Sequence, residues 1–198
     1  MKSPKISNLT EELLHKGRFS YKMVSFDYES DQKSKEHHKR LVFDRGNGAA
    51  ILLYNLEHQT IVLIRQFRVP ALLNNHPNGM LIEACAGTLE ENDPEDCIRR
   101  EAEEETGYHI GSVNKIMEVY MSPGAMTEKL YLFTAPYLSE MKLSQGGGLV
   151  EEHEDIEVLE LPFSKALTLM KNGEIEDAKT VLLLQYAQLH IFNNQPIK

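Results

Sequence analysis

Four glutamates fall within five consecutive positions of the segment REAEEETGY. On a helix, residues three and four apart share a face, so we expect Glu101, Glu104 and Glu105 to project together. Ile98 and Ala102 can then face the core. Like charges at this spacing repel unless a cation lies among them, and hard divalent cations such as Mg²⁺ or Mn²⁺ prefer oxygen ligands. The alternative is a solvated acidic face, which is the usual outcome for a charge run taken alone.

The chain around this cluster predicts a strand, a short loop and a capped helix. The segment MLIEACAG is expected to form a strand that stops at Gly87. Asp93 can cap the next helix, and Pro94 can take its first position, where the missing N–H costs nothing. Gly107 is a good candidate for the left-handed residue that ends the helix. The acidic side chains therefore belong to a helix with a defined start and end.

The remaining segments predict a strand-rich first half and two C-terminal helices. ESDQKSKEHH and NLEHQ are expected to be polar connectors, and the glycines at 146–148 a flexible loop. The final helix is expected to bury one side, formed by Val181, Leu182, Leu184, Leu189 and Phe192. Because strands and helices do not alternate regularly, the predicted fold class is α/β of the α+β type rather than a doubly wound parallel sheet. The expected strands are 18–28, 39–44, 48–55, 60–69, 112–120, 129–137 and 155–162, and the expected helices are 163–173 and 177–192.

Composition limits the classes of partner. The 198 residues are 41% hydrophobic and 26% charged, which is typical of one globular domain, and the net charge of -9 argues against a broad basic surface for nucleic acid. No apolar run approaches the roughly 20 residues that span a bilayer, and the N-terminus lacks the apolar stretch of a signal peptide. We therefore expect a cytoplasmic protein without a membrane partner. Cys85 and Cys97 are expected to be reduced and buried.

The segment GTLEENDPEDCIRREAEEETGY resembles the signature of the Nudix hydrolases, G-x5-E-x7-R-E-U-x-E-E-x-G-U, in which U is apolar. The spacing from Gly87 to Arg100 is one residue shorter than in the signature, and Asp93 stands at the position of its first glutamate. The likeness extends to the branch that contains GDP-mannose pyrophosphatases, which is close to the ADP-ribose pyrophosphatases. It is carried by VFDRGNGAAILLYN, VLIRQFRVP, LIEACAG, YMSPGAMTE, EDIEVLELPF and GEIEDAKTVLLL. The signature residues matched are Gly87, Arg100, Glu101, Ala102, Glu104, Glu105, Gly107 and Tyr108.

The resemblance implies a mixed β-sheet sandwiched between helices. It also implies an N-terminal β extension over residues 1–45, which such enzymes use to form a homodimer, and a Nudix domain over residues 46–198. The implied activity is Mg²⁺-dependent hydrolysis, with Mn²⁺ as a substitute, of a nucleoside diphosphate sugar, foremost GDP-mannose to GMP and mannose 1-phosphate. Two alternatives stay open. One is ADP-ribose as substrate, giving AMP and ribose 5-phosphate, and the other is a sensor that binds a nucleotide sugar without cleaving it.

The resemblance also implies roles for individual residues. The metal ligands would be Glu101, Glu105, Glu154 and the backbone carbonyl of Ala86. Arg100 would orient a neighbouring glutamate, Glu104 would support catalysis, and Glu154 would act as base or metal ligand, a choice that the sequence leaves open. Without the family, the segment VEEHEDIE is a plain acidic loop. The residues expected to bind substrate are Arg18, Lys39, Arg40, Arg68, Ala86, Gly87, Thr88, Glu105, Glu128, His153, Glu154 and Lys179.

Overall fold

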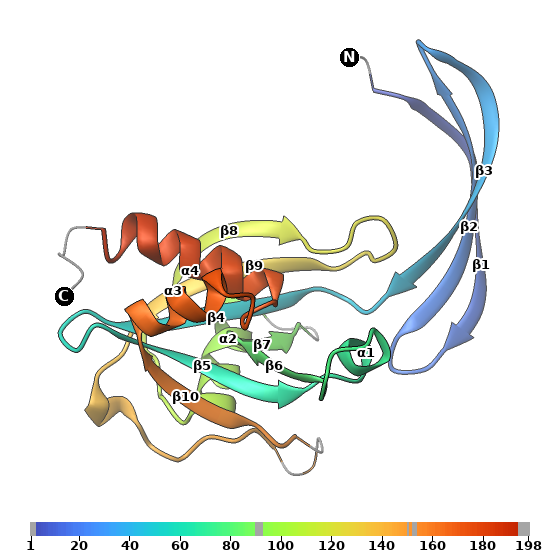
Figure 1. The fold of residues 1–198 in the computed structure, drawn as a ribbon. Helices are drawn as coiled ribbons and strands as arrows, with labels where there is room; N and C mark the ends of the chain where they lie inside the picture. The colour runs from blue at the N-terminus through green and yellow to red at the C-terminus, as the bar shows by residue number, and fades with distance from the viewer. Residues whose placement is uncertain (1–2, 90–92, 150, 152–153, 194–198) are drawn as a thin grey trace. The chain divides into compact units, whose positions relative to one another are not determined.

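The computed structural model describes residues 3–89, 93–149, 151 and 154–193 (Figure 1). The chain forms two compact units. The first consists of Met1–Asn47 and Tyr120–Lys129, and the second of Gly48–Val119 and Leu130–Lys198. Each unit is described by itself below.

The first unit contains an antiparallel sheet with strand order β1-β2-β3. Its strands are β1 (Lys5–Lys16), β2 (Ser20–Ser30) and β3 (Lys33–Asp44). The expected strand at 18–28 is confirmed as β2, but the polar segment at 29–38 is not the connector that we expected, because most of it belongs to β3. The resemblance implied β structure over residues 1–45, but the residue pattern did not single out β1. Its side chains alternate too weakly to reveal a buried face, and almost all of them are exposed, so pairing with β2 is what defines this strand.

The second unit is built on a mixed sheet with strand order β10-β5-β4-β9-β8. Strand β4 runs parallel to β9 and antiparallel to β5. Two short strands extend the sheet, with β6 paired to β5 and β7 paired to β4. The strands are β4 (Gly48–Asn55), β5 (Thr60–Phe67), β6 (Met80–Glu83), β7 (Cys85–Thr88), β8 (Asn114–Tyr120), β9 (Lys129–Pro136) and β10 (Glu157–Pro162).

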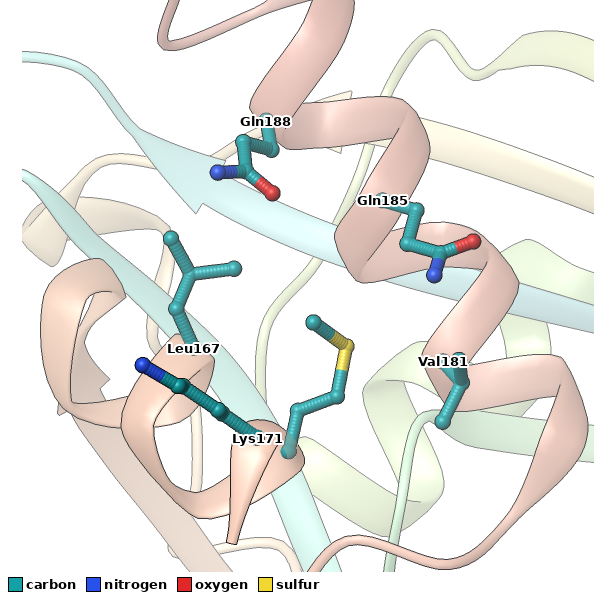
Figure 2. A pocket seen from close by; sticks show the side chains of 6 residues that line it. Leu167, Lys171, Val181, Gln185 and Gln188 are labelled. Atoms are coloured by element: carbon teal, nitrogen blue, oxygen red, sulfur yellow. The ribbon is translucent and has the colours of Figure 1, made fainter.

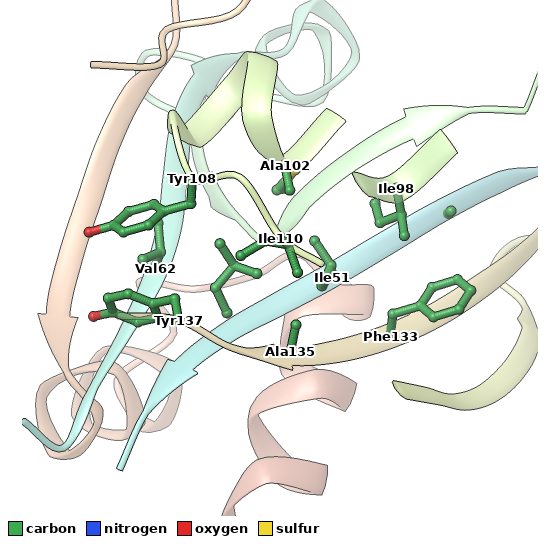
Figure 3. Close-up of a cluster of buried hydrophobic side chains, with 12 residues drawn as sticks. Ile51, Val62, Ile98, Ala102, Tyr108, Ile110, Phe133, Ala135 and Tyr137 are labelled. Atoms are coloured by element: carbon green, nitrogen blue, oxygen red, sulfur yellow. The ribbon is translucent and has the colours of Figure 1, made fainter. Parts of the chain in front are cut away.

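Helices cover both faces of this sheet. Along β4, Ile51 packs in a buried cluster with Ile98 and Ala102, as Figure 3 shows. These two residues belong to the continuous helical segment 94–106, which we call the acidic helix. Leu52 points to the other face, because successive strand residues alternate, and it is also fully buried. Helix α4 contacts β4 from that side. The predicted mixed sheet between helices is thereby confirmed. The helices are α1 (Val69–Leu73), α2 (Pro94–Glu101), α3 (Phe163–Lys171) and α4 (Ala178–His190), with a π-helix at Ala102–Thr106 and a 3-10 turn at Ser139–Met141.

The segment MLIEACAG forms two strands and not the single strand that we expected. The break falls at Ala84, where the chain leaves β5 and pairs with β4 instead. The backbone N–H of Ala84 donates to the side-chain oxygen of Thr180 in α4 at 2.7 Å. A hydrogen bond outside the sheet thus replaces the ladder bond at the crossover.

The final helical segment buries only part of the predicted set of residues. Leu184 and Phe192 are buried as expected and Leu182 is partly buried, but Leu189 is 61% exposed, and Leu183 and Ala187 also line the core. Val181 lines a cavity of about 460 Å³ between α3 and α4, shown in Figure 2. The other residues that line it are Leu167, Met170, Lys171, Gln185 and Gln188. Among the described residues, the helices are too short or too polar to cross a bilayer.

Candidate active site

The acidic helix begins and ends where the sequence predicts. The side chain of Asp93 accepts a hydrogen bond from the Glu95 N–H at 2.9 Å, and Pro94 opens the first turn. Gly107 ends the helix in the left-handed conformation with φ 81°. The interior differs, because Ala102–Thr106 forms a π-helix. Its i→i+5 bonding widens the spacing of residues that share a face, and the Thr106 hydroxyl donates to the Ala102 carbonyl within this turn.

The glutamates that were expected to project together have different partners. Arg100 donates to Glu101 Oε1 at 2.7 Å and to Glu104 Oε2 at 2.6 Å, so its guanidinium bridges these two carboxylates. Glu105 points instead toward strand β7, where its Oε2 accepts a hydrogen bond from the Ala86 N–H at 3.1 Å. Glu103 faces the exposed side and contacts His109 at 2.6 Å. The helix therefore presents an Arg-bridged pair and a buried carboxylate, and Glu101 and Glu105 both lie against β7.

Glu105 lies in an environment that disfavours its ionised form. The residue is only 2% exposed. Burial, with a smaller contribution from the charges of Glu101 and Glu154, raises the pKa of Glu105 to about 8, although hydrogen bonds from Cys85 and Ala86 oppose the shift. Burial also raises the pKa of Glu101, against the lowering effect of Arg100. Because the charges of these three carboxylates act on one another, a cation in their midst would stabilise all of them.

Gly87 in β7 makes room for Glu101. A Cβ at this position would lie 2.1 Å from Glu101 Cδ, well inside contact distance. The glycine is therefore required by the close approach of a carboxyl group to the backbone of β7, and not by a turn. Ala86 and Thr88 lie on either side of it in the same strand, opposite Ala50 and Gly48 of β4.

Gly87→Ala is expected to displace the Glu101 carboxyl group and to lower kcat by roughly 10²-fold, the cost of misplacing a reacting group by about an ångström. The protein should stay folded, because the added methyl meets the end of a flexible side chain. Steady-state kinetics and thermal unfolding would check this. Gly111→Ala is the matched control, since a Cβ there meets no atom of the described chain within 4 Å. An unchanged kcat in Gly87→Ala would contradict the role of the Glu101 position.

The glycines at 146–148 form a packed segment and not the flexible loop that we expected. All three have positive φ values, of 68°, 110° and 79°. The N–H groups of Gly147 and Gly148 donate to the carbonyls of Glu105 and Glu104 at 2.9 and 3.1 Å. These bonds satisfy carbonyl groups at the C-terminal end of the acidic helix. The loop that follows is thereby attached to that helix.

This attachment brings Glu154 toward the helix. Glu154 Oε2 accepts a hydrogen bond from the Leu149 N–H at 3.0 Å, and the Glu154 N–H donates to the Leu149 carbonyl at 3.3 Å. A Cβ on Gly148 would lie 2.3 Å from Glu154 Oε2, so only glycine leaves the carboxylate in place. The charge of Glu154 raises the pKa of both Glu101 and Glu105. Carboxylates from two distant segments therefore act on one site.

Gly148→Ala is expected to lower kcat at least roughly tenfold, because the methyl would push the Glu154 carboxylate from its position. It should also destabilise the fold by about 1–2 kcal/mol, the cost of a side chain in the left-handed region. Gly173→Ala separates the two effects. Gly173 has a similar φ of 76°, and a Cβ there meets no atom of the described chain within 4 Å. The Gly173→Ala variant should show a similar decrease in Tm and a normal kcat. Equal kinetics in both variants would exclude the positioning effect.

The donors of this site suit a hard divalent cation. They are carboxylate oxygens, with backbone carbonyls of β7 nearby, and two of the carboxyl groups have raised pKa values that a bound cation would reverse. Within the described residues, no group of three or more His, Cys, Asp or Glu side chains is arranged to hold a metal ion. Arg100 instead pairs with Glu101. Residues of the right chemistry are therefore close together, although one oxygen of Glu101 is occupied by Arg100.

Two of the predicted substrate-binding cations meet on one buried carboxylate. Arg68, the residue before α1, donates through Nε and Nη2 to Glu83 at 2.7 and 2.9 Å. Lys179 of α4 donates to the same carboxylate at 2.5 Å and contacts Asp177 at 3.0 Å. Our sequence reasoning missed Glu83 and Asp177. A signal was present, because a single charge inside the apolar segment MLIEACAG is uncommon unless the charge is paired.

Other predicted residues belong to the first unit. Arg18 lies 5.7 Å from the ring centroid of Phe19, Arg40 donates to the Lys39 carbonyl, and Glu128 pairs with Arg45 at 3.3 Å. Their roles toward substrate stay predictions. His153, also predicted to bind substrate, lies outside the described residues. Cys85 and Cys97 are free and buried, as expected.

Comparison with known proteins identifies a family model and relatives that the chain matches. Residues 44–185 match the NUDIX domain family. The GDP-mannose pyrophosphatase of Yersinia pestis is 50% identical over 190 residues, which cover 96% of this chain and 95% of the relative. The corresponding protein of Citrobacter koseri is 51% identical over 184 residues, covering 93% and 95%. A crystal structure of an ADP compounds hydrolase superposes with a TM-score of 0.71 over 98% of this chain and 96% of that one, at 17% identity, and this likeness shows the fold alone.

The family match and the site occupy the same part of the chain. Strand β7, the acidic helix and the loop that carries Glu154 all lie within residues 44–185. The match covers more than half of the chain, and the relatives share about half of its residues along nearly their whole length. The protein therefore belongs to the Nudix family.

Proposed function

We propose that this protein hydrolyses the diphosphate bond of GDP-mannose, releasing GMP and mannose 1-phosphate. The observation that carries the proposal is its 50% identity to GDP-mannose pyrophosphatases over nearly the whole chain. Relatives with this degree of likeness are expected to share the reaction. The acidic helix and the loop that carries Glu154 contribute the carboxylates that we propose take part in the reaction. Gly87 leaves room for the Glu101 carboxyl group, and the packed glycines attach the loop to the helix.

The reaction places water on phosphorus while negative charge builds on oxygens that are already anionic. Nudix enzymes generally use a divalent metal. A bound Mg²⁺ or Mn²⁺ would supply positive charge to the phosphoryl oxygens and lower the pKa of the attacking water. Glu101, Glu105, Glu154 and the Ala86 carbonyl are the groups that we propose hold it. Arg100 would keep Glu101 and Glu104 oriented, and Glu154 would take the proton of the attacking water or complete the ligand set.

Cations are proposed to bind the substrate from other segments. Arg68 keeps 40% of its side chain exposed, so part of its guanidinium can meet an anionic oxygen while the rest is held by Glu83. Lys179 would add a second positive charge from α4. The other predicted substrate-binding residues keep the roles that the resemblance implies, namely Arg18, Lys39, Arg40, Gly87, Thr88, Glu128 and His153.

Product analysis tests the proposal. Purified protein would be incubated with GDP-mannose and, separately, with ADP-ribose, with Mg²⁺ and with EDTA. We expect Mg²⁺-dependent release of GMP and mannose 1-phosphate and a larger kcat/KM for GDP-mannose than for ADP-ribose. Faster cleavage of ADP-ribose would move the assignment to that substrate. Tight binding of GDP-mannose without cleavage would identify a sensor.

The first unit is proposed to form a homodimer. Its three-stranded sheet exposes Leu9 and Leu13, which are 57% and 54% accessible, and an exposed apolar surface of this kind favours association. Light scattering is expected to give a mass close to twice 22.6 kDa. Leu13→Glu should shift the mass toward one chain, whereas Leu143→Glu, at an exposed position of the second unit, should not. A wild-type protein that scatters as a single chain would refute the dimer.

A further inference from the structure

Glu83 is a buried carboxylate at the meeting point of two cations. Its side chain is 3% exposed, and it receives two hydrogen bonds from Arg68 and one from Lys179. The two partners of Glu83 differ in exposure: the Lys179 side chain is 10% exposed and that of Arg68 is 40% exposed. Glu83 therefore lies beneath Arg68, and only Arg68 extends well into solvent.

The charges explain this arrangement. A lone carboxylate would pay a large desolvation cost at this depth, and burial does oppose its ionisation, but Arg68 and Lys179 overcome burial and keep the pKa of Glu83 below its usual value. The bidentate contact with Arg68 uses Nε and one terminal nitrogen, which fixes the plane of the guanidinium. The orientation of the exposed part of Arg68 is thus set from below.

Hydrogen bonds connect the segment around Glu83 to strand β7 of the active site. Ala84, the neighbour of Glu83, donates through its N–H to the Thr180 hydroxyl, and that hydroxyl donates to Asp177 at 2.6 Å. Asp177 caps α4 through the Thr180 N–H and contacts Lys179. Two residues beyond Ala84, Ala86 donates to Glu105. The charge of Glu105 in turn acts on Arg68, whose pKa it helps to raise. The cation pair and the acidic site are therefore parts of one connected structure.

We propose that Glu83 is a positioning residue for substrate binding, which orients the guanidinium of Arg68 toward the anionic diphosphate of the substrate. Lys179 balances the charge of Glu83. The inference rests on the proposed function, because it takes the diphosphate as the ligand of Arg68. Glu83 itself does not touch the substrate, since its two oxygens are occupied by the cations. It acts on binding through the geometry of the guanidinium.

Steady-state kinetics with GDP-mannose and Mg²⁺ tests the proposal. Glu83→Gln is expected to raise KM by roughly tenfold with kcat within about twofold of wild type, because an interaction made equally in the ground and transition states affects KM alone. Glu83→Asp keeps the charge but shortens the side chain, so it should fold even if Glu83→Gln does not, and its KM should also rise by several-fold. KM values within twofold of wild type in both variants would overturn the proposal.

A double-mutant cycle shows whether Glu83 acts through Arg68. If it does, Arg68→Gln and the double variant Glu83→Gln/Arg68→Gln should have the same KM within about twofold, because the second change has no oriented guanidinium left to disturb. Multiplication of the two single effects would overturn the proposal. Glu160→Gln is the control for a merely structural loss. Its carboxylate accepts hydrogen bonds from Tyr108 and Tyr137, so this variant should lower Tm and leave KM unchanged.

Loss of the reaction and loss of the positioning role of Glu83 give different kinetic results. If the wild-type protein releases no GMP from GDP-mannose, the proposed function fails, and the role of Glu83 fails with it. If the wild-type protein cleaves GDP-mannose while the Glu83 variants keep a normal KM, the proposed function stands and the positioning role alone is refuted. Thermal unfolding of every variant in the same buffer confirms that the kinetics report folded protein.

Discussion

Glu105→Gln is expected to lower kcat by roughly 10²–10³-fold. A factor of this size corresponds to the loss of several kcal/mol of transition-state stabilisation by a metal site. Glu105 is 2% exposed and its pKa is raised to about 8, so the neutral form is favoured before a cation binds. Glutamine has the shape of that neutral form, and its amide oxygen can still accept the hydrogen bond from Ala86. The fold should therefore be preserved, with a Tm in EDTA no lower than that of wild type.

The control for this variant lies on the same helix. Glu103→Gln removes a carboxylate that contacts His109 on the exposed side, and turnover should be normal. Glu101→Gln should resemble Glu105→Gln in rate, although it also removes one of the partners of Arg100. Calorimetric titration with Mn²⁺ would add a direct measure, because both active-site variants should bind the metal more weakly. Full activity in Glu101→Gln and Glu105→Gln together would remove the metal assignment from this helix.

Glu154→Gln is expected to lower kcat by roughly 10²–10⁴-fold if the carboxylate is the general base, the range typical of lost proton transfer. The position of the side chain should change little, because the amide keeps its size and its oxygen can still accept from the Leu149 N–H. The measurement is kcat as a function of Mg²⁺ concentration. If Glu154 is the base, the loss persists at saturating Mg²⁺.

The same titration separates the base from a metal ligand. Loss of a ligand would raise the Mg²⁺ concentration needed for half-maximal rate, and excess metal would recover part of the activity. Asp155→Asn serves as the control, since Asp155 is the exposed neighbour in the same acidic segment. A near-normal rate for Glu154→Gln at every Mg²⁺ concentration would move both roles to another carboxylate.

Local patterns predicted the parts of the fold that local interactions define. Asp93, Pro94 and Gly107 mark the ends of the acidic helix, because a cap, a proline and a left-handed glycine act within one turn. Apolar strands such as β4 and β5 were equally visible. The errors lie where distant residues decide the outcome. β1 depends on pairing with β2, and the break at Ala84 depends on a bond from Thr180 in α4, which is 96 positions away.

The candidate site divides along the same line. The residue types and their order were enough to indicate a divalent cation, a Nudix hydrolase and the acidic residues of the helix, since each depends on spacing along one segment. Only the tertiary structure decided that a π-turn directs Glu105 toward β7, that three glycines attach the Glu154 loop to the helix, and that Arg68 and Lys179 share Glu83. The physical reason is that burial, and the shared charge and hydrogen bonding that accompany it, arise between segments far apart in the chain, so no single stretch of sequence contains them.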